Sequence, residues 1–162
     1  MFQREEVKTI ASRMAEPRRF LQIVIGPRQV GKSTAIMQAL ESQNLPFHFA
    51  QADAATPPTR AWLKAQWVQA RSLIQPKTSS AILVIDEVQK ISQWSEEVKL
   101  LWDEDSFDGT DLRVILCGSS SLLLTKGLSE SLTGRFELIR MTHWTLSECS
   151  EAFNMTLNDF LV

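Results

Sequence analysis

Residues 26–33 read GPRQVGKS and fit the pattern G-x-x-x-x-G-K-[ST], in which a glycine-rich turn surrounds phosphate groups. The apolar run LQIVI at residues 21–25 precedes this stretch. Residues 32–42 follow it and carry their apolar side chains on one face, as an amphipathic helix does. A buried strand, a glycine-rich turn and a helix in this order form the setting that the motif requires. The stretch therefore predicts a phosphate-binding loop at the end of a strand.

Phosphate chemistry suggests a role for each part of this loop. Gly26 and Gly31 permit dihedral angles and close approaches that a side chain would prevent. The helix that begins near Lys32 points its free N–H groups at the anion, and the Lys32 ammonium adds charge for the β- and γ-phosphates. Ser33 offers a hydroxyl to Mg²⁺, which prefers oxygen ligands, and Thr34 offers a contact to the α-phosphate. The expected nucleotide-binding residues are Gly26, Pro27, Arg28, Gln29, Val30, Gly31, Lys32, Ser33 and Thr34.

Two carboxylates follow a second apolar run. AILVI at residues 81–85 predicts a central buried strand, and it leads directly into Asp86 and Glu87. Because ligands bind at the carboxyl ends of parallel strands, we expect both carboxylates to lie near the phosphate-binding loop. Asp86 is expected to hold Mg²⁺ through water, and Glu87 to polarise an attacking water as general base. The structural alternative is an N-cap and a surface charge for the next helix.

Three further residues are candidates for the site, and each of them, like Arg28 of the loop, has an ordinary structural alternative. Ser119 or Ser120 follows the apolar run at residues 113–117 and could contact the γ-phosphate or its attacking water, or could cap a helix. Arg135 could reach the nucleotide of a neighbouring subunit or form a salt bridge. Arg28 could face phosphate or solvent. For Arg28 the solvent-facing role is slightly favoured, and the sequence does not choose between the roles of the serines or of Arg135.

Apolar strands alternate with helical segments along the chain. This pattern is typical of an α/β protein whose parallel sheet of about five strands is covered by helices on both faces. We expect one domain over residues 1–153, and residues 154–162 begin a following, truncated segment. The expected strands are 21–25, 47–52, 81–85, 113–117 and 136–141, and the expected helices are 7–14, 32–42, 59–74, 94–109, 128–132 and 147–153.

Composition excludes several classes of protein. The 162 residues are 44% hydrophobic and 22% charged, unlike a disordered chain or a disulfide-stabilised mini-protein. The net charge of −2 disfavours direct nucleic-acid binding, and the two cysteines show no metal-ligand spacing. The charged N-terminus lacks a signal sequence, and the longest apolar stretch is far shorter than the ~20 residues that span a bilayer. We therefore expect a cytoplasmic protein without membrane contact.

Five segments together resemble the AAA+ superfamily of P-loop ATPases, and more narrowly the bacterial and archaeal AAA-14-type predicted ATPases. These segments are GPRQVGKST, ILVIDEVQKISQW, ILCGSSSLLL, SLTGRFELIRM and TLSE. The resemblance implies a three-layer P-loop NTPase fold with strand order 5-1-4-3-2, and it places Ser119 or Ser120 at the sensor-1 position. It also implies an arginine-finger role for Arg135 by analogy, and a C-terminal domain beyond this segment. Gln89 and Trp94 match the family pattern.

The leading hypothesis is a Mg²⁺-dependent ATPase domain that couples the nucleotide state to attached domains or partners, with a homo-oligomer as a possible full-length form. The alternative is a slow nucleotide-held switch that acts through a protein partner, which would not need Glu87 as a base. A small-molecule kinase is disfavoured by the adjacent Asp86 and Glu87. ATP or ADP is the expected nucleotide, because the chain lacks a guanine-reading Asn/Thr-Lys-x-Asp motif.

Overall fold

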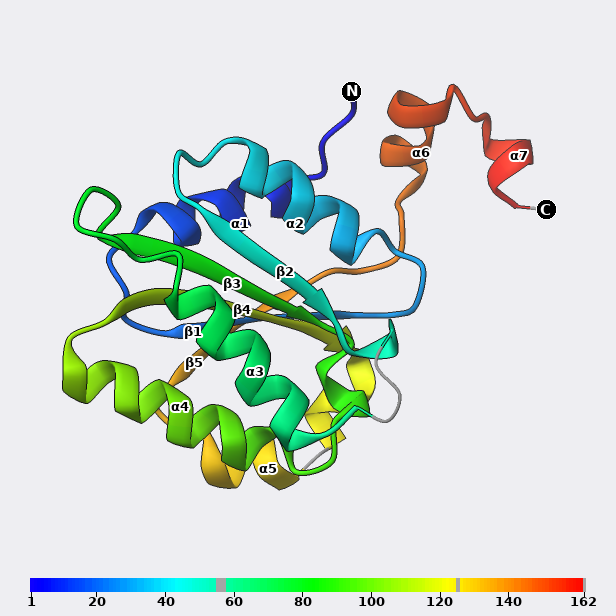
Figure 1. The fold of residues 1–162 in the computed structure, drawn as a ribbon. Helices are drawn as coiled ribbons and strands as arrows, with labels where there is room; N and C mark the ends of the chain where they lie inside the picture. Colours follow the sequence, from blue (N-terminus) through cyan, green and yellow to red (C-terminus); the bar gives the residue numbers. More distant parts are fainter. Residues whose placement is uncertain (55–57, 125, 162) are drawn as a thin grey trace.

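A parallel five-stranded sheet forms the middle layer of the computed structural model, which describes residues 1–54, 58–124 and 126–161 (Figure 1). Its strand order, β2-β3-β4-β1-β5, is the predicted order 5-1-4-3-2 written from the other edge. All neighbouring strands pair in parallel. The strands are β1 (Leu21–Gly26), β2 (Phe47–Gln51), β3 (Ser80–Asp86), β4 (Asp111–Ser119) and β5 (Phe136–Arg140).

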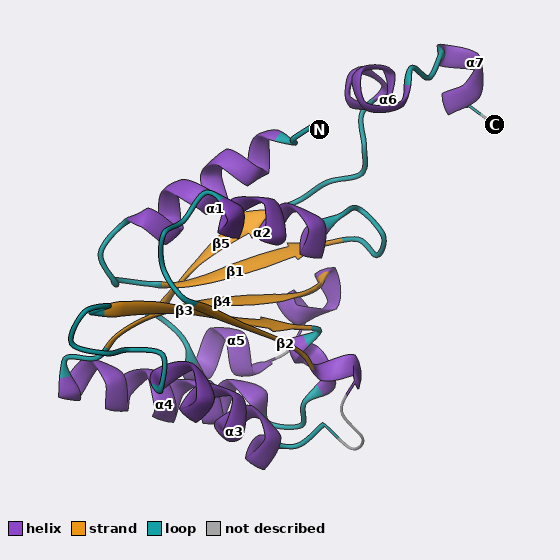
Figure 2. Cartoon of the chain, turned by 45° about the horizontal axis from the view of Figure 1, so that its top comes forward, coloured by secondary structure: helices purple, strands orange, loops and turns teal. Residues whose placement is uncertain are grey.

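Helices cover both faces of the sheet, so the predicted α/β fold with three layers is confirmed (Figure 2). One face carries α1 (Glu5–Ala15) and α2 (Lys32–Glu41). The other face carries α3 (Arg60–Arg71), α4 (Trp94–Asp108) and α5 (Lys126–Ser131). The predicted strands and helices are all present, with small differences at their ends.

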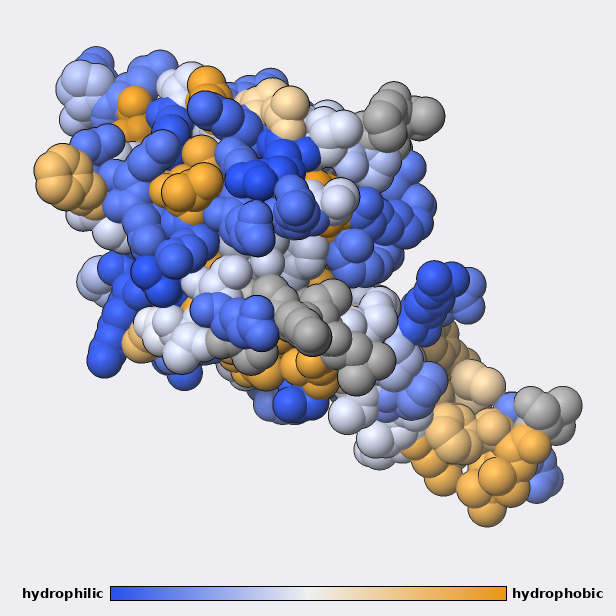
Figure 3. Space-filling view, turned by 90° about the horizontal axis from the view of Figure 1, so that it is seen from below, coloured by the Kyte–Doolittle hydropathy of each residue, from blue (hydrophilic) through white to orange (hydrophobic). Residues whose placement is uncertain are grey.

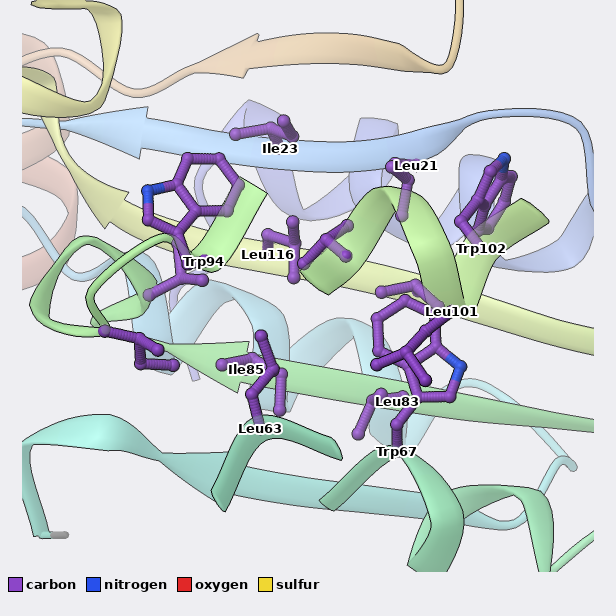
Figure 4. Close-up of a cluster of buried hydrophobic side chains, with 14 of the residues drawn as sticks. Leu21, Ile23, Leu63, Trp67, Leu83, Ile85, Trp94, Leu101, Trp102 and Leu116 are labelled. Carbon is purple, nitrogen blue, oxygen red and sulfur yellow. The ribbon is translucent and has the colours of Figure 1, made fainter. Parts of the chain in front are cut away.

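The apolar strands are continuous because the sheet is buried on both faces. Successive side chains of a strand point to opposite faces. Leu83 and Ile85 of β3 accordingly pack in the cluster beneath α3 and α4, whereas Ile82 and Val84 pack in the cluster beneath α1 and α2. Figure 4 shows the first cluster, in which the large rings of α3 and α4 lie against the sheet: Trp67, Trp94 and Trp102.

Two short helices follow β5, the last strand, at the C-terminal end of the chain. α6 (Leu146–Phe153) and α7 (Leu157–Phe160) project from the rest of the molecule (Figures 1 and 2). Apolar side chains gather on this projection in Figure 3, where Phe153 and Leu161 are 59% and 73% exposed. The proposed boundary at residues 153–154 falls between these helices, and Val162 of the predicted following segment lies outside the described residues.

The strand register brings distant parts of the chain to one edge of the sheet. Gly26 at the end of β1 pairs with Ser119 at the end of β4. Asp86 at the end of β3 pairs with Gln51 at the end of β2. Because parallel strands end at the same edge, the segments that follow these strands form a common surface.

Candidate functional site

The loop between β1 and α2 requires glycine at two positions, and the structural reason differs between them. Gly31 adopts φ 88°, and a Cβ added there would meet no atom within 4 Å, so the left-handed backbone alone favours glycine. A Cβ on Gly26 would lie 2.3 Å from the carbonyl oxygen of Met141. We expected both glycines to serve the dihedral angles and the phosphate contact of the loop. At Gly26 the close approach is instead to the backbone that follows β5.

Lys32, Ser33 and Asp86 converge at the start of α2. The Lys32 side chain is 8% exposed, and its Nζ donates to the carbonyl oxygens of Gly26 at 3.0 Å and Pro27 at 2.5 Å. Ser33 Oγ donates to Asp86 Oδ2 at 2.6 Å. The two residues predicted to hold Mg²⁺ are therefore adjacent, and hydroxyl and carboxylate oxygens are the ligand types which that ion prefers.

Glu87 follows directly and is held at both its backbone and its side chain. It adopts a left-handed conformation with φ 56° and ψ 37°, which costs a non-glycine residue roughly 1–3 kcal/mol and is typical of functional positions. Its backbone N–H donates to Asp86 Oδ1 at 2.8 Å. Its Oε2 accepts a hydrogen bond from Nε2 of Gln89.

These groups surround a pocket of about 330 Å³. Its size falls within the range of small-molecule sites. Arg28 is exposed and is among the residues that line this pocket. The pocket is lined by Arg28, Gln29, Gly31, Lys32, Ser33, Thr34, Asp53, Asp86, Glu87 and Lys90.

Two lining residues, Asp53 and Lys90, were not predicted. They form an ion pair at the rim of the pocket. Asp53 follows β2 in the same way that Asp86 ends β3, so the rule that found Asp86 would also have found Asp53. Lys90 carries no comparable signal, because a lone lysine after a strand is usually a solvated charge.

The two candidate serines lie near the loop but outside this pocket. Ser119 ends β4 beside Gly26, and its hydroxyl is hydrogen-bonded to that of Ser121 at 2.5 Å. Ser120 lines a separate hollow of about 220 Å³ together with Pro27 and His143. The predicted position of their strand between β1 and β3 is confirmed.

The structure does not bring Arg135 to the pocket. Arg135 precedes β5 and therefore lies at the amino edge of the sheet, opposite the loop. Its Nε and Nη2 donate to the carboxylate of Asp103 in α4 at 2.8 and 3.0 Å. The hydrogen bond with Arg135 lowers the pKa of Asp103. Of the two roles left open by the sequence, the salt bridge is the one present in this structure.

Cys117 lies behind the carboxylate of Asp86. Burial raises the pKa of its thiol well above the usual range, and the charge and hydrogen bond of Asp86 raise it further. The thiol is therefore neutral and not a reactive thiolate. The sequence indicated only a buried cysteine here, because its pairing with Asp86 depends on the register of β3 and β4.

Arg4 links the loop to the segment that follows β5, a contact that the sequence did not indicate. Its side chain is buried, and Nη1 donates to the carbonyl oxygens of Val30 at 3.1 Å and Thr142 at 3.0 Å. Its Nε donates to Oε1 of Glu148 in α6 at 2.8 Å. Glu148 also completes a capping box with Thr145 at the start of α6. One arginine thus contacts the loop, the linker and the projecting helix.

Two kinds of feature are absent from the described residues 1–54, 58–124 and 126–161. In these ranges no group of three or more His, Cys, Asp and Glu side chains has the arrangement of a metal cluster. Within the same ranges, no helix has the length and apolar character needed to cross a membrane.

Comparisons with known proteins agree with the fold described above. The AAA-14 family model, described as an AAA domain, matches residues 18–150. No curated protein matches the chain in sequence. The crystal structure of RIF2 from Saccharomyces cerevisiae matches 94% of this chain with a TM-score of 0.60 and 13% identity. The chain spans 61% of that structure's length, and at this identity the likeness shows the fold alone.

Proposed function

The chain belongs to the AAA domain family, whose model covers residues 18–150, and from this premise we propose that it binds ATP or ADP with Mg²⁺ and slowly hydrolyses ATP. The observation that carries the proposal is the convergence of Lys32, Ser33, Asp86 and Glu87 on one pocket. A cation, two oxygen ligands and a candidate base are the groups that phosphoryl transfer to water requires.

Each residue has a separate task in the proposed reaction. Lys32 leaves the carbonyl oxygens of Gly26 and Pro27 and binds the β- and γ-phosphates. Ser33 and Asp86 would hold Mg²⁺, which supplies charge neutralisation at the phosphate oxygens when it is bound. Glu87 accepts a proton from the water that attacks the γ-phosphorus, and the bond to the β-phosphate oxygen breaks to leave ADP and inorganic phosphate.

We further propose that the nucleotide state is coupled to the segment beyond β5. The support is the side chain of Arg4, which joins Val30 in the loop to Thr142 and to Glu148 of α6. A change in the loop that displaces the Val30 carbonyl would alter the hydrogen bonding of a buried arginine. The contacts of α6 would then change with it.

A slow nucleotide-held switch is the second candidate function. It is favoured by the position of Arg135, which would have to leave Asp103 to act in a neighbouring subunit. Among the described residues that line the pocket, Arg28 is the one arginine. An arginine finger accelerates related hydrolases by roughly 10³–10⁵-fold. Without Arg135 of a neighbouring subunit in that role, ATP hydrolysis in this pocket is expected to be slow.

Thermal unfolding with and without Mg²⁺-ATP tests the binding proposal. Binding to the folded state alone adds ~2.7 kcal/mol of stability when free ligand is a hundredfold above Kd. Lys32→Ala should remove most of this stabilisation, whereas Lys64→Ala on the exposed face of α3 should retain it. A folded Lys32→Ala protein with the full ligand effect would contradict the proposed site.

A further inference from the structure

Gln89 contacts the proposed base Glu87, and the proposed reaction gives Gln89 no role. It lies in the short 3-10 helix Val88–Lys90 that follows β3, and its Nε2 donates to Oε2 of Glu87. Its Oε1 is buried and has no hydrogen-bond partner in the described part of the chain. A Cβ on Gly118 would lie 2.3 Å from this oxygen, so the amide packs directly against the backbone of β4.

The carboxylate of Glu87 determines which way the Gln89 amide points. With the amide turned over, its oxygen would face a carboxylate oxygen, and the attraction would become a repulsion. The amide is therefore held with its N–H₂ toward Glu87, and its oxygen is left without a partner beside Gly118. A buried acceptor without a partner is unfavourable, and an apolar side chain of similar shape would avoid this cost. Stability alone does not account for a glutamine here.

We propose that Gln89 is a positioning residue for Glu87, an inference that rests on the proposed hydrolytic function. By holding Oε2, the amide fixes the orientation of the carboxylate and leaves Oε1 free to accept a proton from water. Glu87 lines the pocket, whereas Gln89 is absent from the described lining residues and supports Glu87 from behind. A base oriented by a third group is a recurring arrangement in enzyme sites.

The backbone geometry strengthens this assignment. The N–H of Glu87 is bonded to Asp86 Oδ1 and its φ is 56°, so its main chain is already fixed. The side-chain torsions are the remaining freedom, and the Gln89 amide restricts them. Packing against Gly118 fixes Gln89 in turn, so the ends of β3 and β4 together set the position of the base.

The kinetic test replaces the amide with an unbranched apolar side chain of similar length. Gln89→Met should lower the kcat for Mg²⁺-ATP by about tenfold, part of the ~10²–10⁴-fold that a positioned base contributes. Nucleotide affinity should stay the same, and Tm should change little, because the loss of the hydrogen bond to Glu87 is offset by the removal of the unpaired oxygen. Gln69→Met on the exposed face of α3 is the matched control and should leave kcat unchanged. A purely structural role predicts a lower Tm instead.

A nuclear magnetic resonance experiment on the wild-type protein tests the contact independently of turnover. The Gln89 side-chain amide protons should exchange slowly, and Glu87→Ala should return them to the behaviour of an exposed glutamine. Unprotected protons in the wild type would overturn the inference.

Turnover separates the two proposals. Equal kcat in wild type and Gln89→Met would overturn the positioning role and leave the proposed hydrolysis standing. Nucleotide binding without any wild-type turnover would overturn the hydrolysis and the positioning role together.

Discussion

Replacing each glycine of the loop with alanine should separate packing from backbone conformation. Gly26→Ala places a Cβ 2.3 Å from the carbonyl oxygen and 3.2 Å from the carbonyl carbon of Met141, and these backbone atoms cannot rotate away. The displacement also strains the adjacent hydrogen bond from Met141 N to Ile25 O, at 2.8 Å. Overpacking costs about 1–3 kcal/mol and a weakened hydrogen bond about 0.5–1.5, so the expected loss is about 2–4 kcal/mol.

Gly31→Ala provides the matched comparison. The added Cβ meets no atom within 4 Å, so the cost is that of the left-handed backbone, about 1–2 kcal/mol. At about 2–4 °C per kcal/mol for a protein of this size, Tm should fall by roughly 5–15 °C in Gly26→Ala and by less in Gly31→Ala. Calorimetric unfolding of both variants without nucleotide measures the difference. A Gly26→Ala protein as stable as wild type would refute the packing argument, because the backbone of Met141 would then have room to move.

Three further perturbations test other parts of the structure. Asp103→Asn should cost less than about 1 kcal/mol, since Arg135 and Asp103 are partly exposed. The hydrogen bond with Arg135 lowers the pKa of Asp103 in the folded state, so this contribution is fully present above the ordinary aspartate pKa of about 3.9 and is lost as the pH falls through the folded-state value. Urea unfolding in which the deficit does not shrink as the pH is lowered below about 3.9 would contradict this reasoning. Asp105 is 1% exposed, and its carboxylate accepts a hydrogen bond from Trp67 Nε1 at 2.7 Å. Asp105→Ala should lower the free energy of unfolding by about 3 kcal/mol, as measured by chemical denaturation. A loss below about 1 kcal/mol would exclude a structural role for this bond. Glu87→Gln should keep the thermal stabilisation by Mg²⁺-ATP and slow phosphate release by at least about a hundredfold, and equal turnover would favour the nucleotide-held switch.

Local sequence patterns were sufficient for the elements and for much of the pocket. The loop of residues 26–33 is continuous in sequence, so the prediction of a phosphate-binding loop needs no knowledge of what surrounds it. Asp86 and Glu87 were predicted to approach the loop because parallel strands end at one edge, and this argument needs only the strand and the direction of the sheet. The helix expected over residues 59–74 begins as predicted: Thr59 is the N-cap of α3, and its Oγ1 accepts from Trp62 N at 3.1 Å.

The order of the strands in the sheet was predicted only in part from local sequence patterns. Alternating apolar segments predicted a parallel sheet, but the order 5-1-4-3-2 came from the resemblance to AAA+ ATPases, because hydrophobic periodicity does not say which strands are neighbours. That order places β4 between β1 and β3, and it brings Cys117 behind Asp86. The surroundings that raise the pKa of this thiol could be recognised only once the neighbours of its strand were known.

The remaining features were decided by the tertiary structure alone. The carbonyl oxygen of Met141 accounts for glycine at position 26, and Glu148 accepts a hydrogen bond from Arg4. Arg135 pairs with Asp103 at the edge of the sheet opposite the pocket. In each case the two partners are far apart in sequence and meet only because strands and helices pack in one arrangement. A side chain's type sets which contacts it can make, but helical and strand periodicity report burial and not the identity of the partner. The partner is selected by strand register, close packing and the need to satisfy each buried polar group, which are properties of the folded chain.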